Sequence, residues 1–120
     1  MARKIGVPTV YLASPYSHED EEVRLYRFNA ACKAASKIMS KTVVVYSPIA
    51  HSHSIALYNH EMSWDFWFVQ SMEMLSRCDS LVVLCLDGWE ESTGVTEERD
   101  FAKNHHMPIE YIDPRDLGIE

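Results

Sequence analysis

The chain has 120 residues, of which 47% are hydrophobic, and a formal net charge of -7. This length and composition predict one compact domain over residues 1–120, with enough apolar material for a buried core. The negative charge argues against a nucleic-acid polymer or an anionic membrane as the main partner, because both attract basic proteins. Three widely spaced cysteines, without a signal peptide or a long apolar span, predict a cytoplasmic protein.

Four short apolar runs are typical of β-strands. Residues 7–13, 42–46 and 80–86 are rich in β-branched residues and apolar almost throughout, which is the pattern of strands covered on both faces. A weaker fourth run covers residues 108–112. We expect these runs to pair in one sheet.

Helical patterns lie between the runs. The first covers residues 17–41, where acidic residues crowd the start and Ser17 is the expected N-cap. Two further helices are predicted over residues 64–78 and 94–105. This alternation predicts an α/β fold, a single doubly wound, Rossmann- or flavodoxin-like open parallel sheet of four to five strands with helices on both faces.

In such a sheet, ligands bind beyond the carboxyl ends of the strands, where the strand order reverses. Residues 14–17, 47–53 and 87–94 each follow a predicted strand. We therefore expect these three segments to surround one crevice.

Two adjacent glutamates on the third predicted helix differ in direction. An α-helix turns about 100° per residue, so Glu98 falls on the same face as Val95 and Ala102 and points toward the sheet and the crevice. Glu97 falls on the far side, where we expect a solvated surface carboxylate. An inward carboxylate needs an explanation, because carboxylates are rarely buried without partners.

Two explanations for Glu98 stay open. In the structural one, its carboxylate bonds back to the helix N-terminus or pairs with Arg24 or Arg27 of the first helix. In the functional one, the positive end of the helix dipole keeps Glu98 ionised in a partly dry cleft, where it can attack an electrophilic carbon.

Three stretches carry a family resemblance: VYLASPYS at residues 10–17, CDSLVVL at 78–84, and the pattern Ser92-x-Gly94-Val95-x-x-Glu98-x-x-x-Ala102. Together they resemble the nucleoside 2-deoxyribosyltransferase superfamily, and most closely its small branch of 2'-deoxynucleoside 5'-phosphate N-hydrolases. The resemblance implies cleavage of the bond between base and sugar through a covalent glutamyl intermediate, giving free base and deoxyribose 5-phosphate. Two alternatives are base exchange by a transferase and a nucleotide-binding module that has lost catalysis.

The resemblance also implies roles for individual residues. Glu98 matches the nucleophile, and Tyr11 matches the tyrosine that hydrogen-bonds the nucleophile and the sugar. The residues placed near the 5'-phosphate are Ser14, Ser17, Ser92 and Gly94, although capping is the favoured role of Ser17. Hydroxyls and backbone N–H groups at the start of a helix can bind phosphate without a basic protein.

The chain departs from the family at the proton donor for the departing base. The matching position is Ser71, which points inward from the second predicted helix but cannot replace a carboxylic acid. Asp65, Glu61 and Asp87 are the substitutes that we considered.

Histidines and aromatic residues complete the expectations. His51, His53 and His60 lack the spacing of a catalytic zinc site, so we expect no metal and no cofactor. We expect His51 and His53 to line the crevice after the second strand or to bond to loop carbonyls. Aromatic residues at 64–68 cover too much of their helix for one core, so some should form a subunit interface or a wall for the nucleobase. The family implies a homodimer or higher homo-oligomer with a small-molecule nucleotide or nucleoside as ligand.

Overall fold

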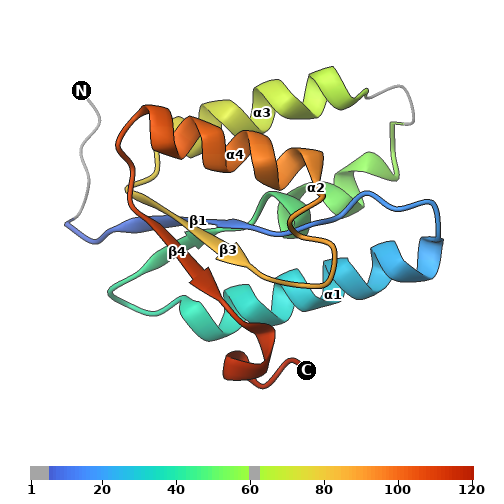
Figure 1. Ribbon diagram of the computed structural model, residues 1–120, viewed down its shortest axis with the longest axis horizontal. Helices are drawn as coiled ribbons and strands as arrows, with labels where there is room; N and C mark the ends of the chain where they lie inside the picture. The colour runs from blue at the N-terminus through green and yellow to red at the C-terminus, as the bar shows by residue number, and fades with distance from the viewer. Residues whose placement is uncertain (1–5, 60–62) are drawn as a thin grey trace.

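The computed structural model describes residues 6–59 and 63–120, in which strands and helices alternate along the chain (Figure 1). The elements are β1 (Thr9–Ala13), α1 (Glu21–Ile38), β2 (Val44–Tyr46), α2 (Pro48–Ala56), α3 (Trp64–Ser76), β3 (Ser80–Leu84), α4 (Thr93–Asn104), β4 (Ile109–Ile112) and the 3-10 helix η1 (Pro114–Leu117). All four expected strands are therefore confirmed, each within the run that predicted it.

The four strands form one parallel sheet in the order β2-β1-β3-β4. Tyr11 of β1 lies opposite Tyr46 of β2 on one side and Leu81 of β3 on the other. The chain leaves β1 toward β2 and then crosses to β3 on the other side, so the strand order reverses at β1. The predicted α/β fold with an open, doubly wound parallel sheet is confirmed, and the switch in strand order lies between β1 and β3.

Helices cover both faces of the sheet. Successive residues of a strand point to opposite faces, so each central strand contributes side chains to the cores on both sides. Tyr11 and Ala13 pack in one core cluster with Leu75 of α3 and Val95 of α4. Leu12 packs in a second cluster on the other face, where it meets the buried alanines Ala30, Ala34 and Ala35 of α1. Small side chains let α1 lie close to the sheet, and this two-sided burial explains why the strand sequences are apolar almost throughout.

The first helix begins later than expected. Asp20, rather than Ser17, is its N-cap, and the Asp20 carboxylate accepts a hydrogen bond of 2.8 Å from the backbone N–H of Glu22. A carboxylate also interacts favourably with the positive end of the helix, as do Glu21 and Glu22 in the first turn. The N-cap assignment of Ser17 was therefore wrong, and Ser17 stays in the loop that follows β1.

A helix that we did not predict, α2, occupies most of the segment expected to be a loop over residues 47–53. Ser47 caps it by accepting a hydrogen bond of 3.1 Å from the N–H of Ala50. Pro48 follows at the first helical position, where a missing N–H costs no hydrogen bond. These two residues are a helix-start signal, but the nine-residue helix is too short for its apolar period to be recognised.

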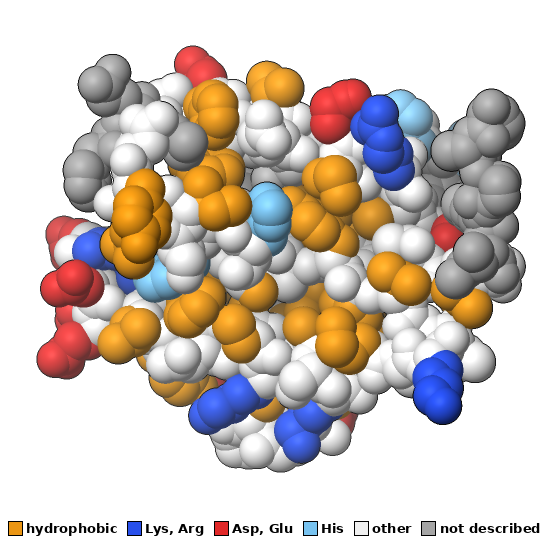
Figure 2. Space-filling view, turned by 180° about the vertical axis from the view of Figure 1, so that it is seen from behind, with side chains coloured by type: hydrophobic (Ala, Val, Ile, Leu, Met, Phe, Trp, Pro, Cys, Tyr) orange, Lys and Arg blue, Asp and Glu red, His pale blue; other side chains and the backbone are white. Residues whose placement is uncertain are grey.

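The outer surface is uneven in character. Acidic side chains gather at the edge where α1 begins, and hydrophobic side chains lie in several groups on the face turned away from the view of Figure 1 (Figure 2). Leu57 and Tyr58, just after α2, are exposed by 62% and 90%. The expected homo-oligomer stays a prediction. Among the helices of the described residues, none has both the length and the apolar character needed to cross a bilayer.

Candidate active site

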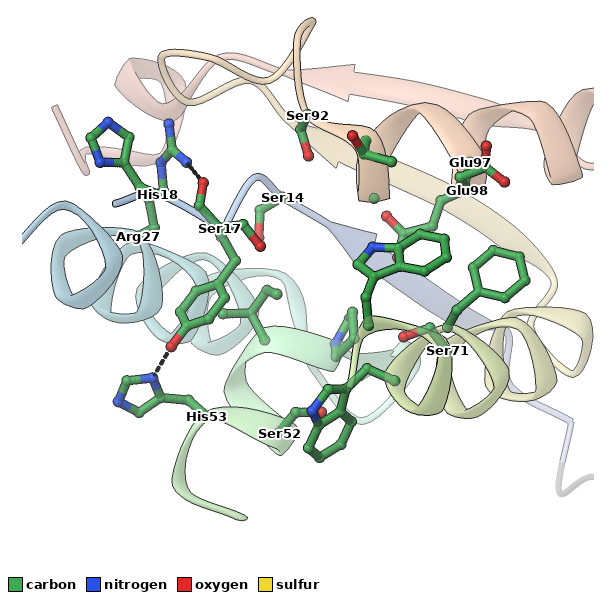
Figure 3. Close-up of a pocket in the computed structure, with 18 of the residues that line it drawn as sticks. Ser14, Ser17, His18, Arg27, Ser52, His53, Ser71, Ser92, Glu97 and Glu98 are labelled. Carbon is green, nitrogen blue, oxygen red and sulfur yellow. Dashed lines mark hydrogen bonds between the residues drawn. The ribbon is translucent and has the colours of Figure 1, made fainter. Parts of the chain in front are cut away.

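A cavity of about 1070 Å³ lies at the carboxyl ends of β1 and β3, where the fold places ligand sites. Its walls are the loop after β1, one side of α2, the first half of α3, and the loop that leads into α4 (Figure 3). Its volume is at the upper end of the range of about 300–1,000 Å³ that is usual for small-molecule sites. The expected site residues that line it are Ser14, Ser17, Ser71, Asp87, Ser92, Gly94 and Glu98.

Glu98 points inward from α4, as its helical angle predicted. Its side chain is 7% exposed and lines the cavity. Its Oε2 accepts a hydrogen bond from the hydroxyl of Tyr11, a fully buried residue of β1. The pair expected from the family resemblance is thus brought together from opposite ends of the chain.

Neither arginine considered as a partner of Glu98 fills that role. Arg24 donates to the backbone carbonyl of His18, and Arg27 donates to backbone carbonyls of the two loops that border the cavity. In residues 6–59 and 63–120, no ion pair involves Glu98. The structural explanation of this buried carboxyl is therefore not supported, and Tyr11 is its hydrogen-bond partner.

Burial decides the protonation of Glu98. Loss of water raises the pKa of Glu98 to about 8, and the hydrogen bond from Tyr11 lowers it only in part. Glu98 is the sixth residue of α4, and the field of a helix terminus falls off within the first turn. At neutral pH Glu98 is therefore mainly protonated, contrary to the ionised state expected from the helix dipole.

Tyr11 stays a neutral donor. Burial raises the pKa of Tyr11 well above its ordinary value, the nearby Glu98 raises it further, and hydrogen bonding to Ser71 acts in the opposite direction. Ser71 of α3, which lines the cavity, therefore interacts with the Tyr11 hydroxyl that binds Glu98. The hydroxyl of Tyr11 can orient Glu98 but cannot serve as a base near neutral pH.

Two serines, Ser14 and Ser92, also line the cavity. Ser92 caps α4, and its Oγ accepts a hydrogen bond of 3.2 Å from the N–H of Val95. Ser14 is only 5% exposed, and its Oγ is the one buried side-chain oxygen or nitrogen without a hydrogen-bond partner in the described part of the chain. A buried hydroxyl without a partner is costly, so one that lines a cavity together with a helix N-terminus points to a ligand with acceptor oxygens.

Gly94 leaves room at the same helix N-terminus. A Cβ placed there would meet only the Ser92 Oγ, at 4.0 Å, which is an ordinary contact. Packing within the protein therefore does not require glycine at position 94. Gly94 lines the cavity, and its role toward a ligand stays a prediction.

Arg27 and Gly88 are site residues that sequence reasoning missed. The guanidinium of Arg27 donates to the carbonyl of Ser17 at 2.9 Å and to the carbonyl of Asp87 at 3.0 Å, which ties together the loops after β1 and β3. Gly88 has a φ of +88°, and a Cβ there would lie 2.7 Å from Nη2 of Arg27. The Asp-Gly turn was visible in the sequence, but nothing in the sequence connected it with an arginine 61 positions earlier.

The aromatic residues of α3 form one wall. Trp64, Trp67 and Phe68 line the cavity, and Trp64 stacks on Phe68 with 5.0 Å between ring centroids. These rings offer a flat apolar surface on the wall that also carries Ser71. The expectation that part of this run borders a ligand pocket is compatible with their position.

Glu97 differs from the expectation. It is half-buried and lines the cavity together with Glu98, so its assignment as an outward surface carboxylate was wrong. The cavity extends past the edge of α4, so two residues about 100° apart on the helix can both border it.

Of the proton donors considered earlier, Asp87 lines the cavity, Asp65 is exposed outside it, and Glu61 lies outside the described residues.

The two described histidines of the H-x-H pair point in different directions. His51 is exposed and rests against Tyr46, with 5.6 Å between ring centroids, so its assignment to the crevice was wrong. His53 lines the cavity, shares a hydrogen bond of 2.7 Å with the hydroxyl of Tyr16, and stacks on Phe28. The cause is α2, because residues two apart on a helix differ by about 200° in direction.

Metal ligands do not gather in the described residues, where no group of three or more histidine, cysteine, aspartate or glutamate side chains could hold a metal ion. His60 lies outside these residues. The chemistry that the cavity offers among the described residues is therefore that of carboxyl, hydroxyl, guanidinium and imidazole groups.

Comparison with known proteins gives one family. The family model described as "Domain of unknown function (DUF1937)" matches residues 8–113, which include every element that forms the cavity. A search of curated proteins found no match.

Proposed function

The chain belongs to the DUF1937 family, and we propose that it hydrolyses the N-glycosidic bond of a 2'-deoxynucleoside 5'-monophosphate. The observation that carries this proposal is the buried pair of Glu98 and Tyr11 in the wall of a nucleotide-sized cavity. A buried carboxyl with a single hydroxyl partner is unfavourable for stability, so its position is best explained by chemistry.

The phosphate would bind at the start of α4. The Oγ of Ser14 has no partner among the described residues, Ser92 and Gly94 at the start of α4 line the same cavity, and the glycine lets a ligand approach the backbone. The base would lie against the rings of α3, and the sugar would lie between these two regions, beside Glu98. In this arrangement Tyr11 orients the nucleophile.

The reaction has two steps. The Glu98 carboxylate attacks the anomeric carbon, and the bond from this carbon to the base nitrogen breaks with its electron pair going to the base, which a proton donor protonates. Water then attacks the anomeric carbon of the glutamyl ester, gives its proton to the conjugate base of that donor, and releases deoxyribose 5-phosphate. Glu98 is regenerated as a carboxylate.

The proton donor must come from another residue than Ser71, whose hydroxyl is too weak an acid. Glu97 is our candidate, because it lies on α4 beside Glu98 and borders the cavity across from the wall that carries Ser71 (Figure 3). A base seated against α3 would be within the space that these residues share. Asp87 and Glu91 border the cavity from the loop before α4, near the phosphate end instead.

The reaction should depend on pH through Glu98. Only the carboxylate can attack, and with a pKa of about 8 it is scarce at neutral pH. With a nucleotide whose base is already cationic and leaves without protonation, we therefore expect kcat/KM to rise with pH and to level off above about pH 8, because kcat/KM reports the groups of the free enzyme and no proton donor is needed. With an ordinary nucleotide the donor must stay protonated, so its deprotonation opposes this rise. A rate with the cationic-base nucleotide that falls between pH 6 and pH 9 would contradict Glu98 as the nucleophile.

A panel of 2'-deoxynucleoside 5'-monophosphates tests the proposal. Chromatography should detect free base with the wild-type protein and none with Glu98→Gln, which keeps the shape and the acceptor oxygen but cannot attack. Adding a second base to the corresponding unphosphorylated 2'-deoxynucleosides distinguishes the transferase, which would form a new nucleoside. If the wild type and Glu98→Gln release equal amounts of base with every nucleotide, the proposal is wrong.

A nucleotide-binding module without turnover is a second candidate. Two points favour it: the resemblance to the N-hydrolases puts Ser71, a cavity-lining residue, where those enzymes have the acid, and burial keeps Glu98 mainly protonated at neutral pH. Calorimetry with the same nucleotides would then show tight binding to the wild type, with no base released even at pH 9. Detectable hydrolysis that depends on Glu98 would exclude this candidate.

A further inference from the structure

Arg27 is a cation placed in the cavity without an acidic partner. It is the single lysine or arginine among the cavity-lining residues of the described chain. In the same described residues, the ion pairs are Arg77 with Glu73 and Arg115 with Asp113, and none involves Arg27. This is unexpected in a chain with 18 acidic and 11 basic residues, where a carboxylate partner would be easy to supply.

The guanidinium is held in place by neutral groups. Within the described residues its hydrogen bonds go to the carbonyls of Ser17 and Asp87, which fix its position but do not cancel its charge. An arginine side chain carries five N–H donors, so these bonds leave donors for a ligand. Gly88, whose lack of a Cβ gives the guanidinium room, belongs to the same arrangement.

A second observation points to a ligand at this end of the cavity. Ser14 is buried, lines the same cavity and has an Oγ without a partner in residues 6–59 and 63–120. Figure 3 shows Ser17, Ser14 and Ser92 between Arg27 on one side and Glu98 on the other. A ligand that satisfied both Ser14 and Arg27 would carry several acceptor oxygens and a negative charge.

We propose that Arg27 determines the preference for a phosphorylated substrate, by binding the 5'-phosphate from the side opposite the start of α4. This inference rests on the proposed function. Arginine suits the role because its planar fork matches phosphate oxygens, and hydrogen bonds between charged groups are stronger than neutral ones. A nucleoside without phosphate would leave this part of the cavity unused.

Turnover of matched substrates tests the role. With a 2'-deoxynucleoside 5'-monophosphate, Arg27→Gln should lower kcat/KM by about 10- to 100-fold, the usual effect of a lost charged hydrogen bond. With the corresponding 2'-deoxynucleoside, kcat/KM should fall much less, because only the two loop contacts of Arg27 are lost, and Arg27→Lys should restore part of the loss with the nucleotide. Arg24→Gln is the matched control, because Arg24 lies one turn earlier on α1 and does not line the cavity.

A purely structural role gives a different result. If Arg27 serves only to tie the two loops together, Arg27→Gln will lower kcat/KM equally for the nucleotide and the nucleoside, and the inference is overturned. The ratio of the two values of kcat/KM is therefore the decisive readout.

Binding provides a readout that does not need turnover. In calorimetry, the wild type should bind the nucleotide more tightly than the nucleoside, and inorganic phosphate should compete for the nucleotide site. Arg27→Gln should abolish both effects while Arg24→Gln keeps them. This result without hydrolysis would support the role of Arg27 and reject the proposed function, whereas hydrolysis with an unchanged nucleotide preference in Arg27→Gln would do the reverse.

Discussion

Replacing Glu98 by glutamine should change how the stability of the protein depends on pH. The pKa of Glu98 is about 8 in the folded protein and 4.5 for an ordinary glutamate, so the folded state binds this proton more tightly than the unfolded state. Its contribution to the free energy of unfolding is therefore fully present below pH 4.5, decreases as the pH rises, and is lost above about pH 8.

The two pKa values differ by about 3.5, which at about 1.36 kcal/mol per unit corresponds to about 5 kcal/mol in total. About 3 kcal/mol of this change falls between pH 5.5 and pH 9. Glutamine resembles the protonated glutamate in shape, can accept the hydrogen bond of Tyr11, and does not ionise. Glu98→Gln should therefore match the wild type at low pH and exceed it increasingly as the pH rises.

Urea unfolding followed by tryptophan fluorescence measures this difference, because the chain contains three tryptophans. The quantity to plot is the free energy of unfolding of Glu98→Gln minus that of the wild type, at intervals from pH 5.5 to pH 9. Glu110→Gln, a change to an exposed glutamate of β4, is the control and should give a flat difference. A flat difference for Glu98→Gln as well would refute the reasoning that burial controls this carboxyl.

Three further predictions follow from the same contacts. Tyr11→Phe removes the hydrogen bond that lowers the pKa of Glu98, so the rise of kcat/KM with pH, measured with a nucleotide whose base leaves without protonation, should move to higher pH. Gly88→Ala places a Cβ at positive φ and against Arg27, so thermal unfolding should show a loss of about 1–3 kcal/mol, whereas an unchanged Tm would contradict the observed turn. Glu97→Gln should slow hydrolysis of ordinary nucleotides by about 10²–10⁴-fold, but should have little effect when the base is already cationic and leaves without protonation; equal losses for both would exclude Glu97 as the donor.

The main features of the fold followed from short-range patterns. Strands covered on both faces must be apolar almost throughout, and this requirement makes β1 and β3 recognisable without any structure. The inward direction of Glu98 followed from the helical period and the position of Val95, because a single helix face packs on the sheet.

The predictions that failed each depended on something that an apolar period does not record. The helix α2 is defined by its cap rather than by an apolar period, and missing it led to the wrong placement of His51, whereas His53 lines the cavity as expected. Glu97 was misplaced because the width of the cavity depends on how α3 and α4 pack, and helical angles carry no information about that packing. The position of Arg27 depends on two carbonyls in distant loops, which no local pattern encodes.

The hydrogen bond between Tyr11 and Glu98 can form only after β1 and α4 have both folded against each other. The two residues are 87 positions apart and come from one of the two central strands and the last α-helix. No early fragment of the chain can hold both, so a nascent or truncated protein has no partial version of this pair. Substitutions that loosen the central strands should accordingly reduce the fraction of competent molecules in a preparation, while each intact molecule keeps its full rate.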